Sequence, residues 1–269
     1  MSDVKDEVIR LAQKGYQEVV LTGIHLSSYG VDFKDSDHNL LSLIQSIHQV
    51  DGITRIRLGS LEPRIITEEF VQTLSGLWKV CPHFHLSLQS GCQETLERMN
   101  RRYTADEYRE KCQILRKYYE NPALTTDVIV GFPQESLEEF RESYEFVKEI
   151  QFYETHIFKY SRRKGTKADK MEGQIPEQEK TRRSEQMIAL GQERAFQYEN
   201  SFLGGKLDIL LEEEIQIDGK SYLTGHSREY IKAAVPAEGG WKINDCVCMI
   251  PERFLKDRLL TGTVTKFSL

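Results

Sequence analysis

Residues able to hold a small polar ligand recur where five short apolar runs of the sequence end. The ends carry Thr22 and Gly23; Ser60 and Glu62; Gln89 and Ser90; Gly131 and Phe132; and Tyr160 and Ser161. A serine beside a carboxylate, as at Ser60 and Glu62, can hydrogen-bond a ribose or an ammonium group. No two acids pair convincingly for acid–base catalysis, so an ordinary barrel enzyme that uses carboxylates is the weakest alternative.

Each of these strand ends also has a purely structural explanation. Gly23 could only make a turn, and Ser60 and Glu62 could form a turn that starts a helix. Gln89 and Ser90 could cap a helix that follows at residue 93, and Phe132 could be ordinary core packing. These alternatives stay open on the residues alone.

The elements that position these residues alternate between helix and strand. Apolar spacing predicts helices at 3–14, 39–50, 67–77, 104–119 and 136–150, and strands at 16–23, 53–60, 83–90, 124–133 and 154–161. Such alternation favours a parallel sheet with crossover helices, in a barrel or a doubly wound fold. Function in these folds sits at the carboxyl ends of the strands, where all five polar ends would meet.

Local capping signals mark several helix ends. Ser2 is expected to be an N-cap and Gly15 to end the same helix. Thr67 is expected to cap the third helix, while Thr104 with Glu107 and Ser136 with Glu139 form capping boxes. Asp127 falls inside a strand at a barrel-interior position, where a carboxylate needs a partner.

The pattern changes after residue 161. A basic loop is followed by a long charged helix at 177–199, and then by short strands separated by turns. We expect the last part to be a small antiparallel β-barrel. The predicted organisation is one domain over 1–200 and a second over 201–269.

The composition of the chain argues against several classes of protein. The 269 residues carry a net charge of −6, so any nucleic-acid binding must come from a local basic patch. No apolar run approaches the length of a membrane span and no signal peptide opens the chain, so the expected location is cytoplasmic, without membrane contact. The five cysteines lack disulfide or zinc spacing, and His25 and His85 lack metal partners at ligand spacing, so all are expected to be structural.

Five ordered motifs make the chain resemble the radical-SAM methylthiotransferases that modify tRNA. They are "LTGIHLSSYG", "RIRLGSLEP", "LSLQSGCQETLERMNRRYT", "TDVIVGFPQES" and "HIFKYSRRKGTKA". The "GIHLSSYG" motif is most similar to the branch that acts on N6-threonylcarbamoyladenosine at tRNA position 37. The final barrel resembles the TRAM module, an RNA-binding β-barrel. The resemblance implies a partial radical-SAM barrel that adds a methylthio group to C2 of the nucleoside.

Two departures from the family pattern stand out. The family holds a [4Fe–4S] cluster with a C-x-x-x-C-x-x-C loop, and this spacing is absent. We therefore expect a fragment that lacks the N-terminal domain, the first barrel strand and the cluster ligands, and that is inactive alone. In "GFPQES", Gln134 stands where the family usually has glycine, which would restrict the loop backbone. An exposed barrel edge would favour association.

The resemblance implies S-adenosyl-L-methionine (SAM) as cofactor, with [4Fe–4S] clusters in the full-length parent that this chain does not ligate. Backbone groups of Thr22, Gly23 and Ile24 would meet the SAM amino group, and the strand end at Gly131 would lie against the adenine. The complete expected SAM-binding set is Thr22, Gly23, Ile24, Ser60, Glu62, Gln89, Ser90, Asp127, Gly131, Phe132, Phe158 and Tyr160. His156, Phe158 and Tyr160 alternate along the last strand and would face the barrel interior.

The implied partner is tRNA, contacted at its anticodon loop. Candidate phosphate contacts are local basic groups, and the small barrel adds basic and aromatic residues that would alternate along one strand face. The expected RNA-binding residues are Arg101, Arg102, Arg162, Arg163, Lys164, Arg228, Tyr230 and Lys232. A non-catalytic RNA-binding fragment or regulator is the alternative function.

Overall fold

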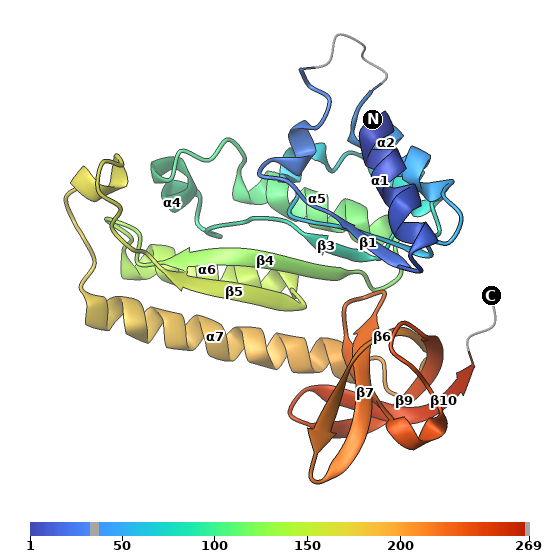
Figure 1. Ribbon diagram of the computed structural model, residues 1–269. Helices are drawn as coiled ribbons and strands as arrows, with labels where there is room; N and C mark the ends of the chain where they lie inside the picture. The colour runs from blue at the N-terminus through green and yellow to red at the C-terminus, as the bar shows by residue number, and fades with distance from the viewer. Residues whose placement is uncertain (33–37, 267–269) are drawn as a thin grey trace.

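The computed structural model describes residues 1–32 and 38–266, and Figure 1 shows its two parts. The first part contains five parallel strands: β1 (Glu18–Leu21), β2 (Arg55–Leu58), β3 (His83–His85), β4 (Ala123–Val130) and β5 (Glu154–Lys159). β1 pairs with β2, and β3, β4 and β5 form a three-stranded sheet in that order. Parallel bridges from Ile56 to Val80 and from Leu61 to Leu86 join the two sets. The result is a curved, open α/β half-barrel, as the alternation predicts.

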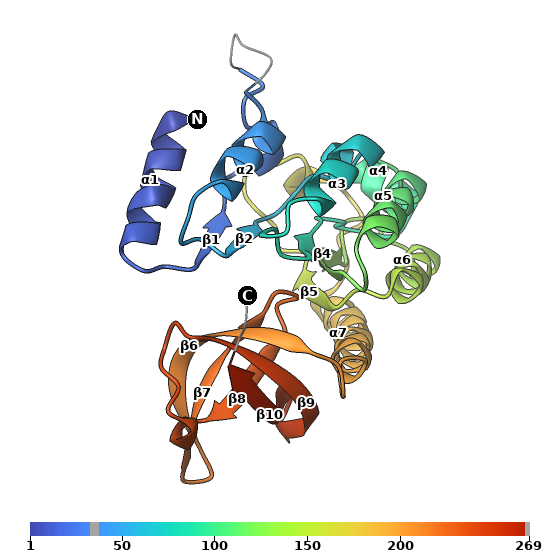
Figure 2. The same ribbon diagram turned by 90° about the vertical axis from the view of Figure 1, so that its right-hand side faces the viewer.

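Helices cover the outer side of this curved sheet. They are α1 (Ser2–Gln13), α2 (Leu40–His48), α3 (Glu68–Ser75), α4 (Gln93–Arg98), α5 (Ala105–Tyr118), α6 (Leu137–Ile150) and α7 (Glu177–Asn200). Figure 2 looks along the strands and shows the helices as an outer arc around them. Fully buried apolar side chains fill the space between the layers, among them Ile44, Ile56 and Phe84. The inner, concave face of the sheet carries no helix layer (Figure 2).

The capping signals behave largely as predicted. The hydroxyl of Thr67 accepts from the backbone of Phe70, and both capping boxes, at Thr104 and Ser136, are formed. Gly15 follows α1 with φ +88°, which suits a glycine stop. The prediction for Ser2 is wrong, because Ser2 is already helical and Met1 stands at the N-cap without a side-chain bond.

The second part is a closed barrel of five strands. These are β6 (Leu207–Ile217), β7 (Lys220–Ser227), β8 (Lys232–Pro236), β9 (Cys246–Lys256) and β10 (Leu259–Lys266), in the order β10-β8-β7-β6-β9. Its core includes Ile209, Val235 and Met249. We expected a wholly antiparallel barrel. The structure differs at its closure, because β10 pairs with β8 in parallel, at Leu260 and Ala233.

The small barrel packs at the N-terminal ends of the parallel strands. Two arginines of β2 reach across: Arg55 donates to the carbonyls of His226 and Asp208, and Arg57 to those of Ser227 and Arg228. Both arginines are almost completely buried. The carboxyl ends of the strands, at the left of Figure 1, therefore lie away from the small barrel.

Candidate functional site

The loop after β1 is open and has no fold-imposed need for its glycine. Thr22 and Gly23 are exposed, and Ile24 is 98% exposed. A Cβ atom added to Gly23 would meet nothing closer than Leu26, at 3.7 Å, and the φ of Gly23 is not in the left-handed region. The fold does not require a glycine at this exposed strand end. A glycine there fits a position where a ligand comes close to the backbone, because glycine has no side chain.

The loop after β2 lies beside the loop after β1. The backbone N–H of Glu62 donates to the hydroxyl of Ser27 over 2.9 Å, and its carboxylate lies 3.6 Å from Nδ1 of His25. Ser60 and Glu62 are both exposed. Neither residue is consumed by packing, so this carboxylate and hydroxyl are available to a ligand.

Both predicted site residues of the loop after β3, Gln89 and Ser90, are buried. Gln89 has φ +71° and bridges to β4, donating its backbone N–H to the carbonyl of Asp127. Ser90 is fully buried, and its hydroxyl accepts from the N–H of Cys92 at the start of α4. Ser90 is therefore engaged with the N-cap residue of α4, and Gln89, at 9% exposed, is also largely buried.

The loop after β4 is held in place by a buried ion pair. The N–H of Gly131 donates to Glu135 over 2.7 Å, and the same carboxylate lies 2.6 Å from a guanidinium nitrogen of Arg183 in α7. Burial raises the pKa of Glu135, and the hydrogen bond from Arg183 opposes that rise. Gln134 has φ +66°, a conformation that glycine adopts without strain. The expectation that Gln134 occupies a glycine-type position is confirmed.

Aromatic side chains stand beside this loop. Phe132 is 7% exposed and meets Tyr160 edge-on, with ring centroids 5.2 Å apart. Phe158 is 52% exposed and His156 is also exposed, whereas Tyr160 is half-buried. Phe132 is therefore mainly packing, and Phe158 is the aromatic surface left open to a ligand.

Asp127 finds the partner that its position requires. Its carboxylate lies 3.4 Å from Nε2 of His85 in β3, and Nδ1 of His85 lies 3.0 Å from the hydroxyl of Thr125. The hydrogen bond with His85 lowers the pKa of Asp127. This pair is not visible in the sequence pattern, because the two residues come from different strands, β3 and β4, and meet only through the register of the parallel sheet.

Two basic loops flank the strand ends. Arg101 and Arg102 follow α4 and are exposed, and the carbonyl of Arg102 accepts from Arg64. In the loop after β5, Arg162 pairs with Asp169, whereas Arg163 and Lys164 are exposed and have no ion pair within the described part of the chain. These groups provide positive charge on the side where the strands end.

The basic and aromatic residues of the small barrel are arranged differently from the sequence expectation. Arg228 and Tyr230 do not alternate on a strand, because they lie between β7 and β8. Arg228 donates to the carbonyls of Trp78 and Val80, and Tyr230 stacks on His83. Lys232 pairs with Glu213. The first two residues thus join the two parts of the molecule, whereas Lys232 is exposed at the start of β8.

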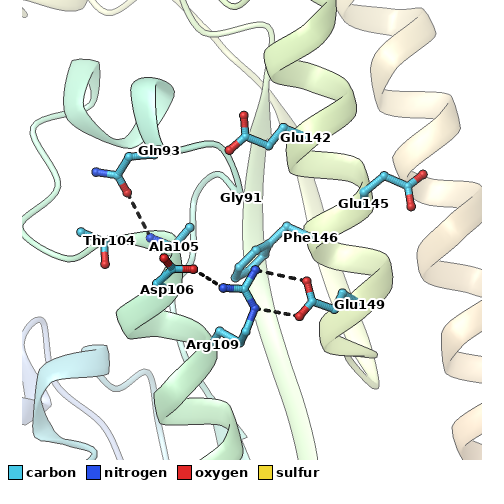
Figure 3. Close-up of a pocket in the computed structure, with 10 residues that line it drawn as sticks. All are labelled: Gly91, Gln93, Thr104, Ala105, Asp106, Arg109, Glu142, Glu145, Phe146 and Glu149. Carbon is cyan, nitrogen blue, oxygen red and sulfur yellow. Dashed lines mark hydrogen bonds and ion pairs between the residues drawn. The ribbon is translucent and has the colours of Figure 1, made fainter.

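A surface pocket of about 550 Å³ lies elsewhere, on the outer side between α5 and α6 (Figure 3). Arg109 crosses it and pairs with Asp106 and Glu149. None of the predicted site residues lines it. The lining is acidic, with Asp106, Glu142, Glu145 and Glu149 against Arg109. We assign the candidate site to the strand ends, where the exposed polar groups predicted from the sequence lie.

The cysteines of the described residues do not fit an iron–sulfur cluster. Cys81, Cys92 and Cys112 are buried, and Cys246 and Cys248 lie in the small barrel. Within residues 1–32 and 38–266, no three cysteine sulfurs converge. Cluster ligands are thiolates, whereas burial raises the pKa of Cys92 and of Cys112 to about 12.

Comparison with known proteins gives a consistent result. The family model described as "Radical SAM superfamily" matches residues 1–147. Within the described residues, no helix is both long enough and apolar enough to cross a membrane.

Curated relatives are similar over most of this chain. A threonylcarbamoyladenosine tRNA methylthiotransferase of Bacillus subtilis is 40% identical over 84% of this chain and 51% of its own length. The enzyme of that name from Thermotoga maritima is 34% identical over 85% and 51%. A tRNA-2-methylthio-N(6)-dimethylallyladenosine synthase of Thermodesulfovibrio yellowstonii is 37% identical over 85% and 51%. The chain spans about half the length of the curated relatives it matches.

Among solved structures, coproporphyrinogen III oxidase of Escherichia coli, described as a radical SAM enzyme, superposes with a TM-score of 0.56. The match covers 72% of this chain and 45% of the other, at 15% identity. This likeness supports the fold alone.

Proposed function

Because the chain belongs to the radical SAM superfamily, we propose that its strand ends bind SAM and that it forms part of a tRNA methylthiotransferase. The proposed substrate is N6-threonylcarbamoyladenosine in the anticodon loop of tRNA, which would receive a methylthio group at C2. The names of its relatives and their 34–40% identity support this choice of reaction class.

The observation that carries the SAM proposal is the combination of an unconstrained glycine and uncommitted polar groups at adjacent strand ends. Gly23 is exposed and not required by the fold, and Ser60 and Glu62 are exposed beside it. We assign the backbone of Thr22 and Gly23 to the SAM ammonium group and the Glu62 carboxylate to the same positive charge or to the ribose.

The other end of the ligand would lie over β4 and β5. Gly131 has φ +72° and packs against the side chain of Lys180, and its loop is fixed by Glu135 and Arg183. Phe158 offers an exposed ring on which an adenine could stack. SAM supplies the group-transfer and radical chemistry of this superfamily. The cysteines here do not fit the cluster, so we assign ligand binding to this chain and no redox step.

For tRNA, we propose that the loops containing Arg101 and Arg102, and Arg163 and Lys164, contact phosphates. They flank the strand ends, so they would position a nucleotide at the SAM site without reading its base. Arg228 and Tyr230 are left out of this surface, because both are engaged between the two parts of the molecule.

The test is calorimetric titration of the purified chain with SAM. We expect saturable binding that Gly23→Ala and Glu62→Gln each weaken by about ten-fold, roughly 1.4 kcal/mol, with unchanged thermal unfolding. Gly76→Ala is the matched control, because an added Cβ there also makes only ordinary contact, at 3.4 Å. The proposal fails if SAM does not bind, or if the control weakens binding as much as Gly23→Ala does.

A further inference from the structure

Three side chains with metal-ligand chemistry meet on the concave face of the sheet. They are His85, Asp127 and His156, one from each of the neighbouring strands β3, β4 and β5. A ring nitrogen of each histidine and a carboxylate oxygen of Asp127 all lie within 4.8 Å of one another. Two imidazoles and one carboxylate suit divalent transition metals, above all Zn²⁺.

We propose that His85, Asp127 and His156 form a binding site for a divalent transition metal ion such as Zn²⁺. Strand register explains why they meet. Asp127 is directly opposite His156 across the β4–β5 ladder, and His85 is opposite Thr125, two residues before Asp127 on the same face. Rigid parallel strands thus fix the three backbone positions.

The spacing of the first two ligands already matches a shared ion. Nε2 of His85 and Oδ2 of Asp127 are 3.4 Å apart. Zinc bonds of about 2.0–2.1 Å in a tetrahedron place ligand atoms about 3.3–3.4 Å from one another. His156 completes the set after a small rotation, for which it has room because its side chain is exposed.

A further contact orients His85 for this role. Nδ1 of His85 lies 3.0 Å from the hydroxyl of Thr125, which is almost completely buried. Metal-binding histidines commonly hold their second ring nitrogen by such a hydrogen bond, which fixes the direction of the first. The side chain of Asp127 is 29% exposed, so water can fill a fourth coordination position.

The proposed metal site lies further from the strand-end loops than the residues assigned to SAM do, and its ligand His156 is two residues before Phe158 on β5. Asp127 lies three residues before the end of β4 at Val130, which is about 10 Å along a strand. The metal proposal gives Asp127 a metal ion as its ligand in place of SAM. This proposal does not depend on the proposed function.

A second cluster of possible metal ligands in the described residues is less suited to a metal ion. Cys92, Glu94 and Glu142 also converge, on the outer side. The Cys92 thiol is fully buried and donates to Glu94 over 3.2 Å. A buried, protonated thiol is a poor ligand, so we do not propose a metal site there.

The experiment is titration of the chelator-treated chain with Zn²⁺ by calorimetry, and with Co²⁺ by visible absorption. We expect one saturable site with micromolar affinity, and visible Co²⁺ bands without the near-ultraviolet band of thiolate coordination. Asp127→Asn and His156→Ala should each weaken binding by about ten-fold or more. His156 is exposed, so its substitution leaves the fold intact, which circular dichroism checks.

The matched control is His25→Ala, since His25 also lies near a carboxylate, that of Glu62, but outside the cluster. It should bind Zn²⁺ as the unaltered chain does. The proposal is overturned if the unaltered chain does not bind Zn²⁺ at micromolar concentrations. It is equally overturned if binding persists in His156→Ala and Asp127→Asn, or if the Co²⁺ spectrum reports thiolate ligands.

Discussion

The ring of Tyr230 lies flat on the ring of His83, with centroids 4.7 Å apart and planes inclined by 9°. This stack joins the turn after β7 to strand β3. The guanidinium of Arg57 stands 4.8 Å from the centre of the Tyr230 ring, and burial lowers the pKa of His83 to about 3. His83 is therefore neutral at physiological pH, and Arg57 supplies the positive charge at this junction.

Arg57→Met should weaken the junction strongly. Arg57 pairs with Glu18 at 2.7 Å, both side chains being largely buried, and it also donates to two carbonyls of the small barrel. Methionine would leave Glu18 without this partner, so we expect a loss of about 3 kcal/mol in the free energy of unfolding. Denaturant titration measures it.

The control for this substitution is Lys117→Met. Lys117 pairs with Glu68 at 2.8 Å, but both side chains are exposed, so the loss should stay below about 1 kcal/mol. Equal losses in the two variants would contradict the importance we give to the buried junction.

Gln134→Gly should stabilise the chain. Gln134 has φ +66°, and a non-glycine residue in this region costs about 1 kcal/mol. Among the described residues, its side chain makes one long hydrogen bond, of 3.4 Å to the carbonyl of Glu172, and lies against Gly173. Thermal unfolding should shift upwards by a few degrees. Gln192→Gly, within helix α7, should instead destabilise by about 1 kcal/mol; a loss in both would mean that the Gln134 side chain matters more than its backbone.

Replacing Arg163 and Lys164 together by alanine should weaken tRNA binding and make it less dependent on salt. Each lost phosphate contact lowers the slope of log affinity against log salt by about 1. Fluorescence anisotropy with a labelled anticodon stem-loop over a salt series gives both quantities. Lys148→Ala on α6 removes an exposed charge from the outer side and should leave the slope unchanged. Equal effects in both variants would argue for non-specific attraction only.

The buried cysteines should resist alkylation and should favour the folded chain at neutral pH. Burial raises the pKa of Cys92 and Cys112 from an ordinary value near 9 to about 12. Their contribution to stability is therefore complete below pH 9 and is lost as the pH rises towards 12. At pH 8, iodoacetamide should modify half-exposed Cys248 before either of them, as peptide mass spectrometry would show. Urea-unfolded chain, in which all five react, is the control; early labelling of Cys112 would refute the prediction.

Local signals in the sequence predict most of the fold. Thr104 and Ser136 cap their helices because their partners are only three residues away, and the parallel strands follow from short apolar runs between helices. The polar strand ends were also predictable, since parallel strands bring their carboxyl ends to one edge.

Contacts between distant segments were not predictable in the same way. Arg228 and Tyr230 have the composition of an RNA-binding strand, yet their partners are Val80 and His83, in the other part of the chain. Likewise, the position of Asp127 within a strand predicts that its carboxylate has a partner, but the identity of that partner, His85, follows only from the register of the sheet. Composition carries no information on which distant surface a side chain will meet.

Helix α7 is fastened at both ends. Near its start, Lys180 donates to the carbonyl of Tyr160 and Arg183 pairs with Glu135; at its end, Glu199 pairs with Arg258 of the small barrel at 2.6 Å. An α-helix turns by about 100° and advances about 1.5 Å for each residue. Insertion or deletion of a single residue within α7 would therefore swing one set of fastenings around the helix axis. The length of this helix is therefore constrained during evolution, because it can change only together with the surfaces that the helix connects.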